Sequence, residues 1–264
     1  MAIRLDRDGG TAILVFDHPD RANALSAHDL VHELPEAWAA IRDDPAIRVA
    51  VVTGAGTESF TSGADLTDPA VVERVAQPSS EGPWRFTGRQ FGVWKPIITA
   101  VNGRCLGGGL WFLGDCDHAL AAQHATVANP GVSLGFVVAS GSIALARRAS
   151  FATVLRMAVF GAHDALTADE ARRAGLVQRV TAAEMLLETA LADAATIGRN
   201  SPAAVERMIR VLWETQTLPL ADAVARAEAV QAEYRGHPDA TEGPRARAER
   251  RAPRWSSSAD PATA

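Results

Sequence analysis

The 264-residue sequence predicts an α/β fold, and three observations support this class. Short apolar segments alternate with turn residues and helical periodicity through the first half of the chain, as in α/β domains. From Ile143 onward the pattern is mostly helical, without a long charged linker. Apolar residues make up 47% of the chain and charged residues 22%, so it can bury a sizeable globular core.

Turn and cap residues delimit the predicted elements. Asp8-Gly9-Gly10 is a hairpin turn signal between two apolar runs. Ser26 is a suitable N-cap for the first helix, although Pro35 interrupts that helix. In chain order, the predicted elements are a hairpin (2–17), a helix (26–42), a strand (47–53), a short segment (59–64), a strand (96–101), a helix (110–116) and two short strands (119–122 and 125–128).

Three boundaries follow from changes in composition. Residues 67–88 are polar and contain Pro and Ser clusters, which predict a loop. A core is expected over residues 1–198, followed by a C-terminal helical region over residues 199–254. Residues 255–264 are rich in Ser, Ala and Pro, which is typical of a disordered tail.

Composition also excludes several classes of protein. The formal net charge of −5 argues against non-specific nucleic-acid binding. No apolar stretch approaches the roughly 18 residues of a membrane span, and the amino terminus does not resemble a signal peptide. Two cysteines, Cys105 and Cys116, are too few for a disulfide framework. We therefore expect a reduced, cytoplasmic protein without membrane or nucleic-acid partners.

The choice of acid–base groups is narrow. Lys95 is the only lysine, beside 25 arginines, and it precedes Pro96 in an apolar run where a tuned amine is not expected. Acid–base chemistry therefore falls to carboxylates and the seven histidines. Nothing in the sequence requires a metal ion.

Two glycine-bearing turns, residues 62–66 and 102–109, each follow an apolar segment. The second contains three consecutive glycines, which let a ligand approach the backbone closely. Backbone N–H groups at the start of the following helix are free to bind an anion. If the two turns meet, they can form an oxyanion hole with two donors; alternatively, the glycines only make tight turns.

Seven motifs in order give the chain a resemblance to the enoyl-CoA hydratase/isomerase (crotonase) superfamily, over about residues 3–255. Each motif is weak alone, but their common order is specific. They are His-Pro-Asp-Arg-Ala-Asn-Ala-Leu (18–25), Val-Val-Thr-Gly-Ala-Gly (51–56), Ser-Gly-Ala-Asp-Leu (62–66), Lys-Pro with Ala-Val-Asn-Gly (95–96 and 100–103), Leu-Gly-Gly-Gly (106–109), Cys-Asp (116–117) and Leu-Thr-Ala-Asp-Glu-Ala-Arg-Arg-Ala-Gly-Leu-Val (166–177).

This resemblance implies a crotonase (ClpP-like) spiral of ββα units with a C-terminal helical trimerisation region. It implies a trimer or a dimer of trimers, and an acyl-CoA substrate whose coenzyme A is the only cofactor. The N–H groups of Ala64 and Gly108 would form the oxyanion hole for the thioester. Further substrate-binding positions implied near the coenzyme A are Arg21, Ala22, Asp65 and Leu66, although Asp65 is equally suited to cap its own turn.

Two positions depart from the family pattern. Hydratases of the family use two glutamates, and here Trp111 and Gly131 stand in their places. Neither residue can transfer a proton, and the loss of one general acid–base group typically costs about 10²–10⁴-fold in rate. Ordinary hydration, and isomerisation through the second glutamate, are therefore not expected.

Other groups near these positions are candidates for the site. Asp115 lies one helical turn beyond Trp111 and is a candidate acid or base, or else makes a structural hydrogen bond. Trp111, Gly131, Ser133 and Phe136 are expected to line the acyl pocket. The sequence therefore predicts an acyl-CoA enzyme that stabilises a thioester enolate and is not an ordinary hydratase.

Two alternatives remain. The chain could be a non-catalytic acyl-CoA-binding protein that has lost its acid–base pair. Ser133 also lies in a Gly-x-Ser-x-Gly motif that is typical of hydrolases. That motif needs a strand before it and a helix after it, whereas Pro130 precedes it and no helix start follows, so a hydrolase is less favoured.

Overall fold

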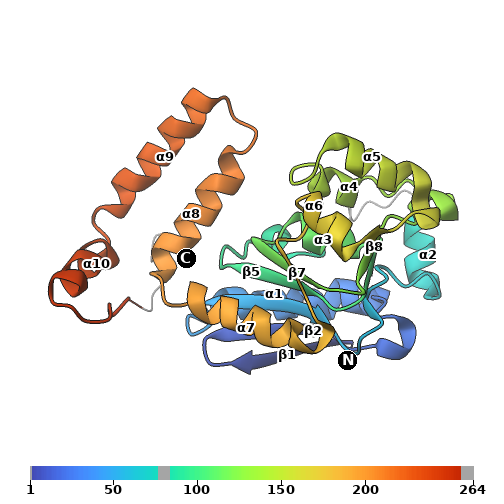
Figure 1. The fold of residues 1–264 in the computed structure, drawn as a ribbon, viewed down its shortest axis with the longest axis horizontal. Helices are drawn as coiled ribbons and strands as arrows, with labels where there is room; N and C mark the ends of the chain where they lie inside the picture. The colour runs from blue at the N-terminus through green and yellow to red at the C-terminus, as the bar shows by residue number, and fades with distance from the viewer. Residues whose placement is uncertain (1, 77–83, 257–264) are drawn as a thin grey trace.

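The computed structural model describes residues 2–76 and 84–256, which form two β-sheets with flanking helices and a helical arm at the carboxyl end (Figure 1). The larger sheet has the order β1-β2-β3-β5-β7-β10 and is parallel except for the β1–β2 hairpin. Its strands are β1 (Ile3–Asp8), β2 (Thr11–Phe16), β3 (Val49–Gly54), β5 (Ile97–Val101), β7 (His118–Ala122) and β10 (Arg179–Thr181).

The smaller sheet has the order β4-β6-β8-β9 and carries the two glycine turns. Its first three strands are parallel, and β9 pairs with β8 in the antiparallel sense. The strands are β4 (Ser59–Thr61), β6 (Arg104–Leu106), β8 (Thr126–Ala128) and β9 (Leu166–Thr167). β6 and β9 had no counterpart among the predicted strands, because two- or three-residue strands lack a recognisable alternation.

The core is continuous between the two sheets. Strands β2, β3 and β5 are buried along their whole length, as expected for a parallel sheet covered on both faces. Helix α7 (Leu186–Ile197) packs against these strands. Phe16, Phe60 and Phe112 form edge-to-face pairs with ring centroids 5.0–5.9 Å apart. These pairs join the two sheets to helix α3 (Gly109–Gly114), which starts at the triple glycine.

The first predicted helix is confirmed, with a local irregularity. The hydroxyl of Ser26 accepts a hydrogen bond from the Asp29 N–H (3.2 Å), so the predicted cap is present. A π-turn over Asp29–Glu33 precedes α1 (Leu34–Asp43). Pro35 lies in the first turn of α1, directly after the π-turn, where the regular i→i−4 pattern is already interrupted.

The predicted loop over residues 67–88 is wrong in part. Helix α2 (Pro69–Ala76) occupies its first half, and Asp68 caps this helix by accepting the Ala70 N–H (2.9 Å). Pro69 therefore begins a helix, since proline is well tolerated at a first helical position. The remaining prolines of that prediction, Pro78 and Pro83, lie outside the described residues.

The carboxyl-terminal helices extend away from the sheets as an arm (Figure 1). The arm consists of α8 (Pro202–Thr215), α9 (Leu220–Tyr234) and α10 (Pro238–Ala248). It is tied to the core where the Trp213 indole donates to Asp117 (3.1 Å). The remaining helices, α4 (Ser140–Leu145), α5 (Phe151–Phe160) and α6 (Ala168–Arg173), lie on the core.

The predicted tail begins too early. The Trp255 indole donates to the Arg199 carbonyl (2.7 Å), and the Ser256 N–H donates to Asp239 (2.7 Å). These two bonds fix residues that composition alone assigned to a disordered segment. The rest of that segment, residues 257–264, lies outside the described residues.

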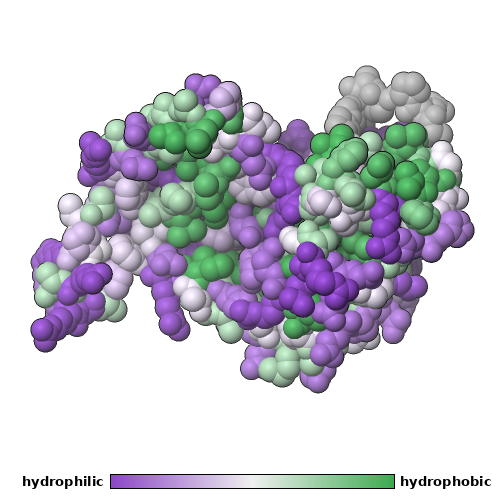
Figure 2. Space-filling model, turned by 45° about the horizontal axis from the view of Figure 1, so that its top comes forward, coloured by the Kyte–Doolittle hydropathy of each residue, from purple (hydrophilic) through white to green (hydrophobic). Residues whose placement is uncertain are grey.

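Apolar side chains reach the surface in two areas, over the α8–α9 arm and over α4–α5 (Figure 2). The arm exposes Met208, Leu212, Leu220 and Val224, and the α4–α5 area exposes Val137, Ile143, Phe151 and Val159. Within residues 2–76 and 84–256, no helix combines the length and apolarity needed to cross a membrane.

Candidate active site

The pairing of β4 with β6 brings the two glycine turns together. The strands run parallel, with Ser59 opposite Arg104, so both turns leave the smaller sheet at the same edge. A Cβ placed on Gly63 would lie 2.4 Å from the backbone nitrogen of Gly108. Gly63 and Gly107 also have positive φ angles of +87° and +52°. Only glycine allows the two backbones to approach this closely.

Two N–H groups at this junction, those of Ala64 and Gly108, have no acceptor within residues 2–76 and 84–256. Ala64 pairs with Leu25 in a short β-bridge. The Leu25 N–H donates to the Gly63 carbonyl (2.8 Å), and the Asp65 N–H donates to the Leu25 carbonyl (2.7 Å). Among the described residues, no acceptor takes the N–H of Ala64 or of Gly108. Two unused donors beside each other are a suitable arrangement for binding an oxyanion.

Phe86 and Thr87 connect the junction to Asp115. A Cβ on Gly108 would lie 2.7 Å from Phe86 Cε1, so the Phe86 ring contacts the second turn. The next residue, Thr87, is buried, and its hydroxyl donates to Asp115 Oδ2 (2.5 Å). Sequence reasoning missed Phe86 and Thr87 because both fall in the segment predicted to be a polar loop.

The environment of Asp115 alters its protonation. Burial raises the pKa of the Asp115 carboxyl above its ordinary value. The hydrogen bond from Thr87 and the charges of Arg89, Arg147 and Arg148 oppose this rise without cancelling it. Asp115 therefore makes the structural hydrogen bond that was one interpretation of it, and it also has the raised pKa expected of a proton-transferring group.

Trp111 lies between the triple glycine and α4. Its indole is partly buried against the core. A Cβ on Gly141, in α4, would lie 3.6 Å from Trp111 Cδ1 and 3.8 Å from the Gly107 carbonyl oxygen. The first turn of α4 therefore packs directly on the glycine turn and on Trp111.

Gly131 is buried, and its surroundings leave no room for a side chain. A Cβ at this position would lie 2.6 Å from Val138 Cγ2. The half-buried Phe136 closes the same turn, since its N–H donates to the Gly131 carbonyl (2.9 Å). A glutamate at position 131 is thus incompatible with the observed position of Val138.

Ser133 has a structural partner. Its hydroxyl accepts the Ala162 N–H (2.9 Å) and thereby ties the 131–134 turn to the end of α5. That turn is a single 3-10 turn that ends at Gly135, with a φ of +77°. The strand and helix that a serine nucleophile elbow requires do not flank it.

The turn after Ala64 is capped by its own carboxylate. Asp65 is buried and accepts hydrogen bonds from the Thr67 N–H (2.9 Å) and hydroxyl (2.6 Å), so turn capping is confirmed. Its second oxygen pairs with Arg21 (2.5 Å), whose side chain stays half exposed. Ala22 follows in a left-handed conformation (φ +53°), and Leu66 is exposed.

Lys95 has a structural environment. Its ammonium group donates to the carbonyls of Ile41 (2.8 Å) and Asp44 (2.6 Å) and so caps the end of α1. Burial lowers the pKa of Lys95, while the carboxylates of Glu206, Asp44 and Asp43 oppose this change. The side chain lies in the core, as expected from its apolar context.

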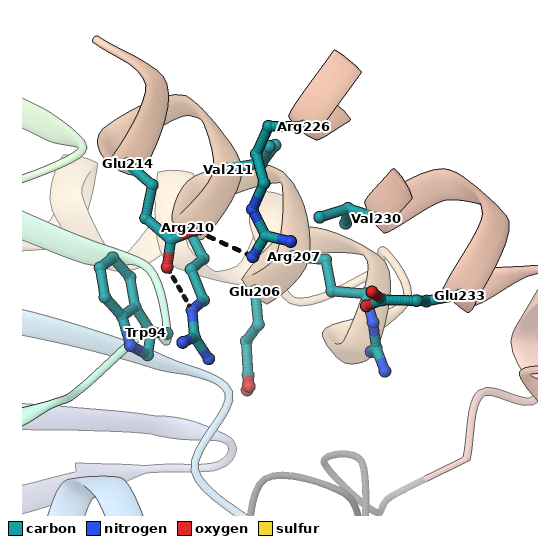
Figure 3. A pocket seen from close by; sticks show the side chains of 9 residues that line it. All are labelled: Trp94, Glu206, Arg207, Arg210, Val211, Glu214, Arg226, Val230 and Glu233. Carbon is teal, nitrogen blue, oxygen red and sulfur yellow. Dashed lines mark hydrogen bonds and ion pairs between the residues drawn. The ribbon is translucent and has the colours of Figure 1, made fainter. Parts of the chain in front are cut away.

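A cavity of about 280 Å³ lies between Trp94 and the helices of the arm (Figure 3). Glu214 accepts from Arg210 on the same helix (2.7 Å) and from Arg226 on α9 (3.1 Å). None of the residues that line it was predicted for the site. Its charges neutralise one another, so the glycine junction, and not this cavity, is the candidate active site.

The chain is similar to known proteins along almost its whole length. The family model for enoyl-CoA hydratase/isomerase matches residues 6–258. A carnitinyl-CoA dehydratase from Salmonella arizonae is 35% identical over 263 residues, which cover 96% of this chain and 98% of the relative. An enoyl-CoA hydratase/isomerase from Mycobacterium paratuberculosis has a crystal structure with a TM-score of 0.88 and 32% identity, over 98% of this chain and 99% of that chain. An enoyl-CoA hydratase from Bacillus anthracis gives a TM-score of 0.87 at 25% identity, over 98% of this chain and 100% of that chain.

Proposed function

Because the chain belongs to the enoyl-CoA hydratase/isomerase family, we propose that it binds an acyl-CoA and stabilises the thioester enolate between the N–H groups of Ala64 and Gly108. The observation that carries this proposal is the backbone contact of Gly63 with Gly108. That contact requires a residue without a Cβ at position 63, and it supports a site in which the N–H groups of Ala64 and Gly108 act together.

The proposed chemistry follows from where charge develops. Removal of a proton, or of a carbon group, next to the thioester carbonyl leaves the electron pair delocalised onto the carbonyl oxygen. Donors held in position by the backbone stabilise this oxygen more strongly than the neutral carbonyl. Loss of one such donor typically lowers the rate about 10²–10³-fold.

Asp115 is the proposed acid or base of the site. It is the carboxylate that the segment 86–87 connects to the Gly108 turn. Its raised pKa brings it closer to neutral pH, where proton transfer in both directions is most efficient. Thr87 orients the carboxylate by donating to one of its oxygens, which leaves the other for the substrate.

The reaction is proposed to differ from addition of water by a carboxylate pair. Relatives of this chain are named carnitinyl-CoA dehydratase. Here, Trp111 and Gly131 supply no carboxylate at the two positions that the family's hydratases use. We favour C–C hydrolysis, decarboxylation or isomerisation with an unusual base, with coenzyme A as part of the substrate and no further cofactor.

The proposed assembly is a homotrimer or a dimer of trimers in the cytoplasm. The apolar areas over the arm and over α4–α5 support this, because one chain leaves both exposed (Figure 2). A head-to-tail contact between two such areas closes into a ring when the rotation permits.

Mass spectrometry of a mixed acyl-CoA pool, incubated with the protein, tests the proposed function. We expect cleavage of a carbon–carbon bond, loss of CO₂, or isomerisation, which leaves the mass unchanged and is followed by deuterium uptake from deuterated water, at an enzymatic rate. Hydration of an enoyl thioester at such a rate would contradict the argument from positions 111 and 131. If every thioester stayed unchanged while one co-purified with the protein, the non-catalytic binding protein would replace the enzyme. Labelling of Ser133 by a fluorophosphonate would instead indicate a serine hydrolase.

A further inference from the structure

One arginine, Arg89, joins the core to the helical arm. Its side chain is only 7% exposed and pairs with Asp117 Oδ2 (2.5 Å). The other oxygen of Asp117 accepts the indole N–H of Trp213 (3.1 Å), which belongs to α8 of the arm. The Arg89 guanidinium also lies 6.0 Å from the centroid of the Trp213 ring, at the limit of a cation–π contact. Arg89 and Trp213 are therefore linked twice, through one carboxylate and through the ring.

The turn that carries Arg89 also holds Asp115. It is a 3-10 turn over Gly88–Phe91, and Thr87 is its N-terminal cap residue. Thr87 donates to Asp115 (2.5 Å), while Arg89, two residues further on, donates to Asp117 (2.5 Å). Two carboxylates that are two residues apart are thus held by two donors that are two residues apart. A displacement of this turn moves both contacts together.

The turn itself is fixed to the core. The Gln90 side-chain oxygen accepts the N–H groups of Phe86 (2.7 Å) and Thr87 (3.0 Å). A Cβ on Gly88 would lie 2.7 Å from Ile97 Cδ1, so the backbone of the turn lies directly on a core side chain. A turn held in this way transmits a change at Arg89 to Thr87 instead of absorbing it.

The arm also orders the positive charge around Asp115. Burial raises the pKa of Asp115, and the charges of Arg89, Arg147 and Arg148 oppose this rise. Two of these three arginines contact the same residue of the arm, because the Arg147 guanidinium lies 5.3 Å from the centroid of the Trp213 ring. Arg147 also donates to the Trp213 carbonyl (3.4 Å). Docking of α8 on the core therefore holds two cations near the carboxylate.

We propose that Arg89 is a positioning residue for Asp115 and that it couples Asp115 to the docking of the arm through Trp213. The inference rests on the role of Asp115 in the proposed function and adds Arg89 and Trp213 to it. Neither residue is required to touch the substrate. With the arm docked, the nearby cations favour the ionised carboxylate, which can accept a proton from the thioester α-carbon. Without that docking, the carboxyl keeps its proton to higher pH.

The first test is the pD dependence of deuterium exchange into butyryl-CoA. In Arg89→Met, the midpoint of the acidic limb should move to higher pD. One unit below the wild-type midpoint, the exchange rate should fall at least about threefold. The KM should change less than about twofold. Arg89→Lys, which keeps a positive charge, should restore the midpoint toward the wild-type value.

Arg42→Met is the matched control for this test. Arg42 also donates to the turn, at the Phe91 carbonyl (3.1 Å), but its side chain is 44% exposed and paired with Asp43. It should leave the midpoint unchanged. An Arg89→Met variant that loses rate equally at every pD, with the wild-type midpoint, would show that Arg89 is only structural and would overturn the inference.

The second test needs no turnover. At pH 8, the change in melting temperature caused by Asp115→Asn is measured in several backgrounds. It should be more positive by about 2 °C in Arg89→Met, because the ionised carboxylate of Asp115 has lost a cation there. Trp213→Leu, which leaves Arg89 in place, should change it in the same direction, and tests the coupling even if Arg89→Met does not fold. Leu212→Ala, at a neighbouring residue of α8 that is 61% exposed, should leave it unchanged.

The outcomes separate the two proposals. If the wild-type protein catalyses exchange but the Arg89 and Trp213 variants behave as their controls do, only the inference is overturned. If the wild-type protein catalyses no exchange, the proposed function is overturned whatever the melting temperatures show, and a positioning role for Arg89 is overturned with it.

Discussion

The two glycine contacts of the site, Gly63 on Gly108 and Gly131 on Val138, differ in what occupies the space of the missing side chain. At Gly63, that space holds the backbone nitrogen of Gly108, at 2.4 Å from the Cβ position. At Gly131, it holds the side chain of a valine, at 2.6 Å. The first contact cannot be relieved by any substitution elsewhere, whereas the second can be relieved by shortening one side chain.

The contact of Gly63 with Gly108 is a requirement of the backbone fold, whereas the contact of Gly131 with Val138 depends on the choice of two side chains. The Gly63–Gly108 contact positions backbone donors, which every reaction through a thioester enolate can use. At the Gly131–Val138 contact, the hydrocarbon side chain of Val138 fills the space that a proton-transferring side chain at position 131 would need. We therefore expect substitution of Gly63 to abolish folding or catalysis, and substitution of Gly131 to have a smaller effect that a change at Val138 relieves.

Gly63→Ala should have the largest effect. The alanine would combine a φ of +87° with an atom 2.4 Å from the Gly108 nitrogen, so we expect insoluble protein or a melting temperature lowered by more than about 10 °C. Gly92→Ala is the control, because Gly92 has a φ of +75° but open space at its Cβ position. A melting temperature of Gly63→Ala equal to that of Gly92→Ala would show that the backbone contact does not matter.

Asp115→Asn should have the next largest effect, on turnover. Loss of a general acid or base is expected to lower kcat about 10²–10⁴-fold with little change in acyl-CoA affinity. Thr87→Val, which removes the orienting hydroxyl, should lower kcat less. Unchanged turnover in Asp115→Asn would reduce Asp115 to a structural residue.

The effect of Asp115→Asn on the free energy of unfolding should depend on pH, in a direction opposite to that expected for a carboxylate whose charge stabilises the fold. Burial raises the pKa of Asp115 in the folded protein, so the carboxylate stabilises less when ionised than when protonated. At neutral pH, Asp115→Asn should be at least as stable as the wild type. This relative advantage should disappear as the pH falls through the raised pKa, because wild-type Asp115 then becomes neutral too. Thermal melts at pH 8 and pH 4 measure both values.

Gly108→Pro should lower kcat about 10²–10³-fold, since it removes one N–H donor. The φ of Gly108 is −60°, which suits proline. Gly108→Ala is the control, because it adds the same contact with Phe86 and keeps the N–H. Because proline also adds ring atoms at a nitrogen that lies close to Gly63, the melting temperatures of both variants are measured beside kcat, and the donor is assigned from variants of equal stability. Equal activities would remove Gly108 from the oxyanion site.

Arg21→Ala should have the smallest effect. Arg21 is half exposed and pairs with the buried Asp65, which keeps two hydrogen bonds from Thr67 when Arg21 is removed. We expect the Kd for an acyl-CoA to rise less than about fivefold, with kcat unchanged. A larger loss of affinity would indicate a direct contact of Arg21 with the coenzyme.

The sequence predicts the glycine junction better than it predicts its surroundings. Residues 62–66 and 107–109 are local motifs, and the pairing of β4 with β6 brings them together as expected. Phe86 and Thr87 could not be assigned, because their contacts with Gly108 and Asp115 join segments that are more than 20 residues apart.

Val138 illustrates the same limit. A glycine at position 131 is visible in the sequence, but what fills the empty space depends on how residues 135–139 fold back. The buried Asn129 decides this, and a single asparagine before a proline indicates only a turn. Helix α2 shows a different limit, because a proline in a polar segment predicts a loop, whereas Pro69 starts a helix.

Deuterium uptake at the thioester α-carbon tests the central claim most directly. A saturated acyl-CoA such as butyryl-CoA is incubated in D₂O with the wild-type protein, Gly108→Ala and Gly108→Pro, and its mass is followed. Enolate stabilisation at Ala64 and Gly108 predicts that the wild-type protein and Gly108→Ala catalyse exchange, and that Gly108→Pro is at least about a hundredfold slower. Bound thioester without exchange, or equal exchange in all three proteins, would contradict the account.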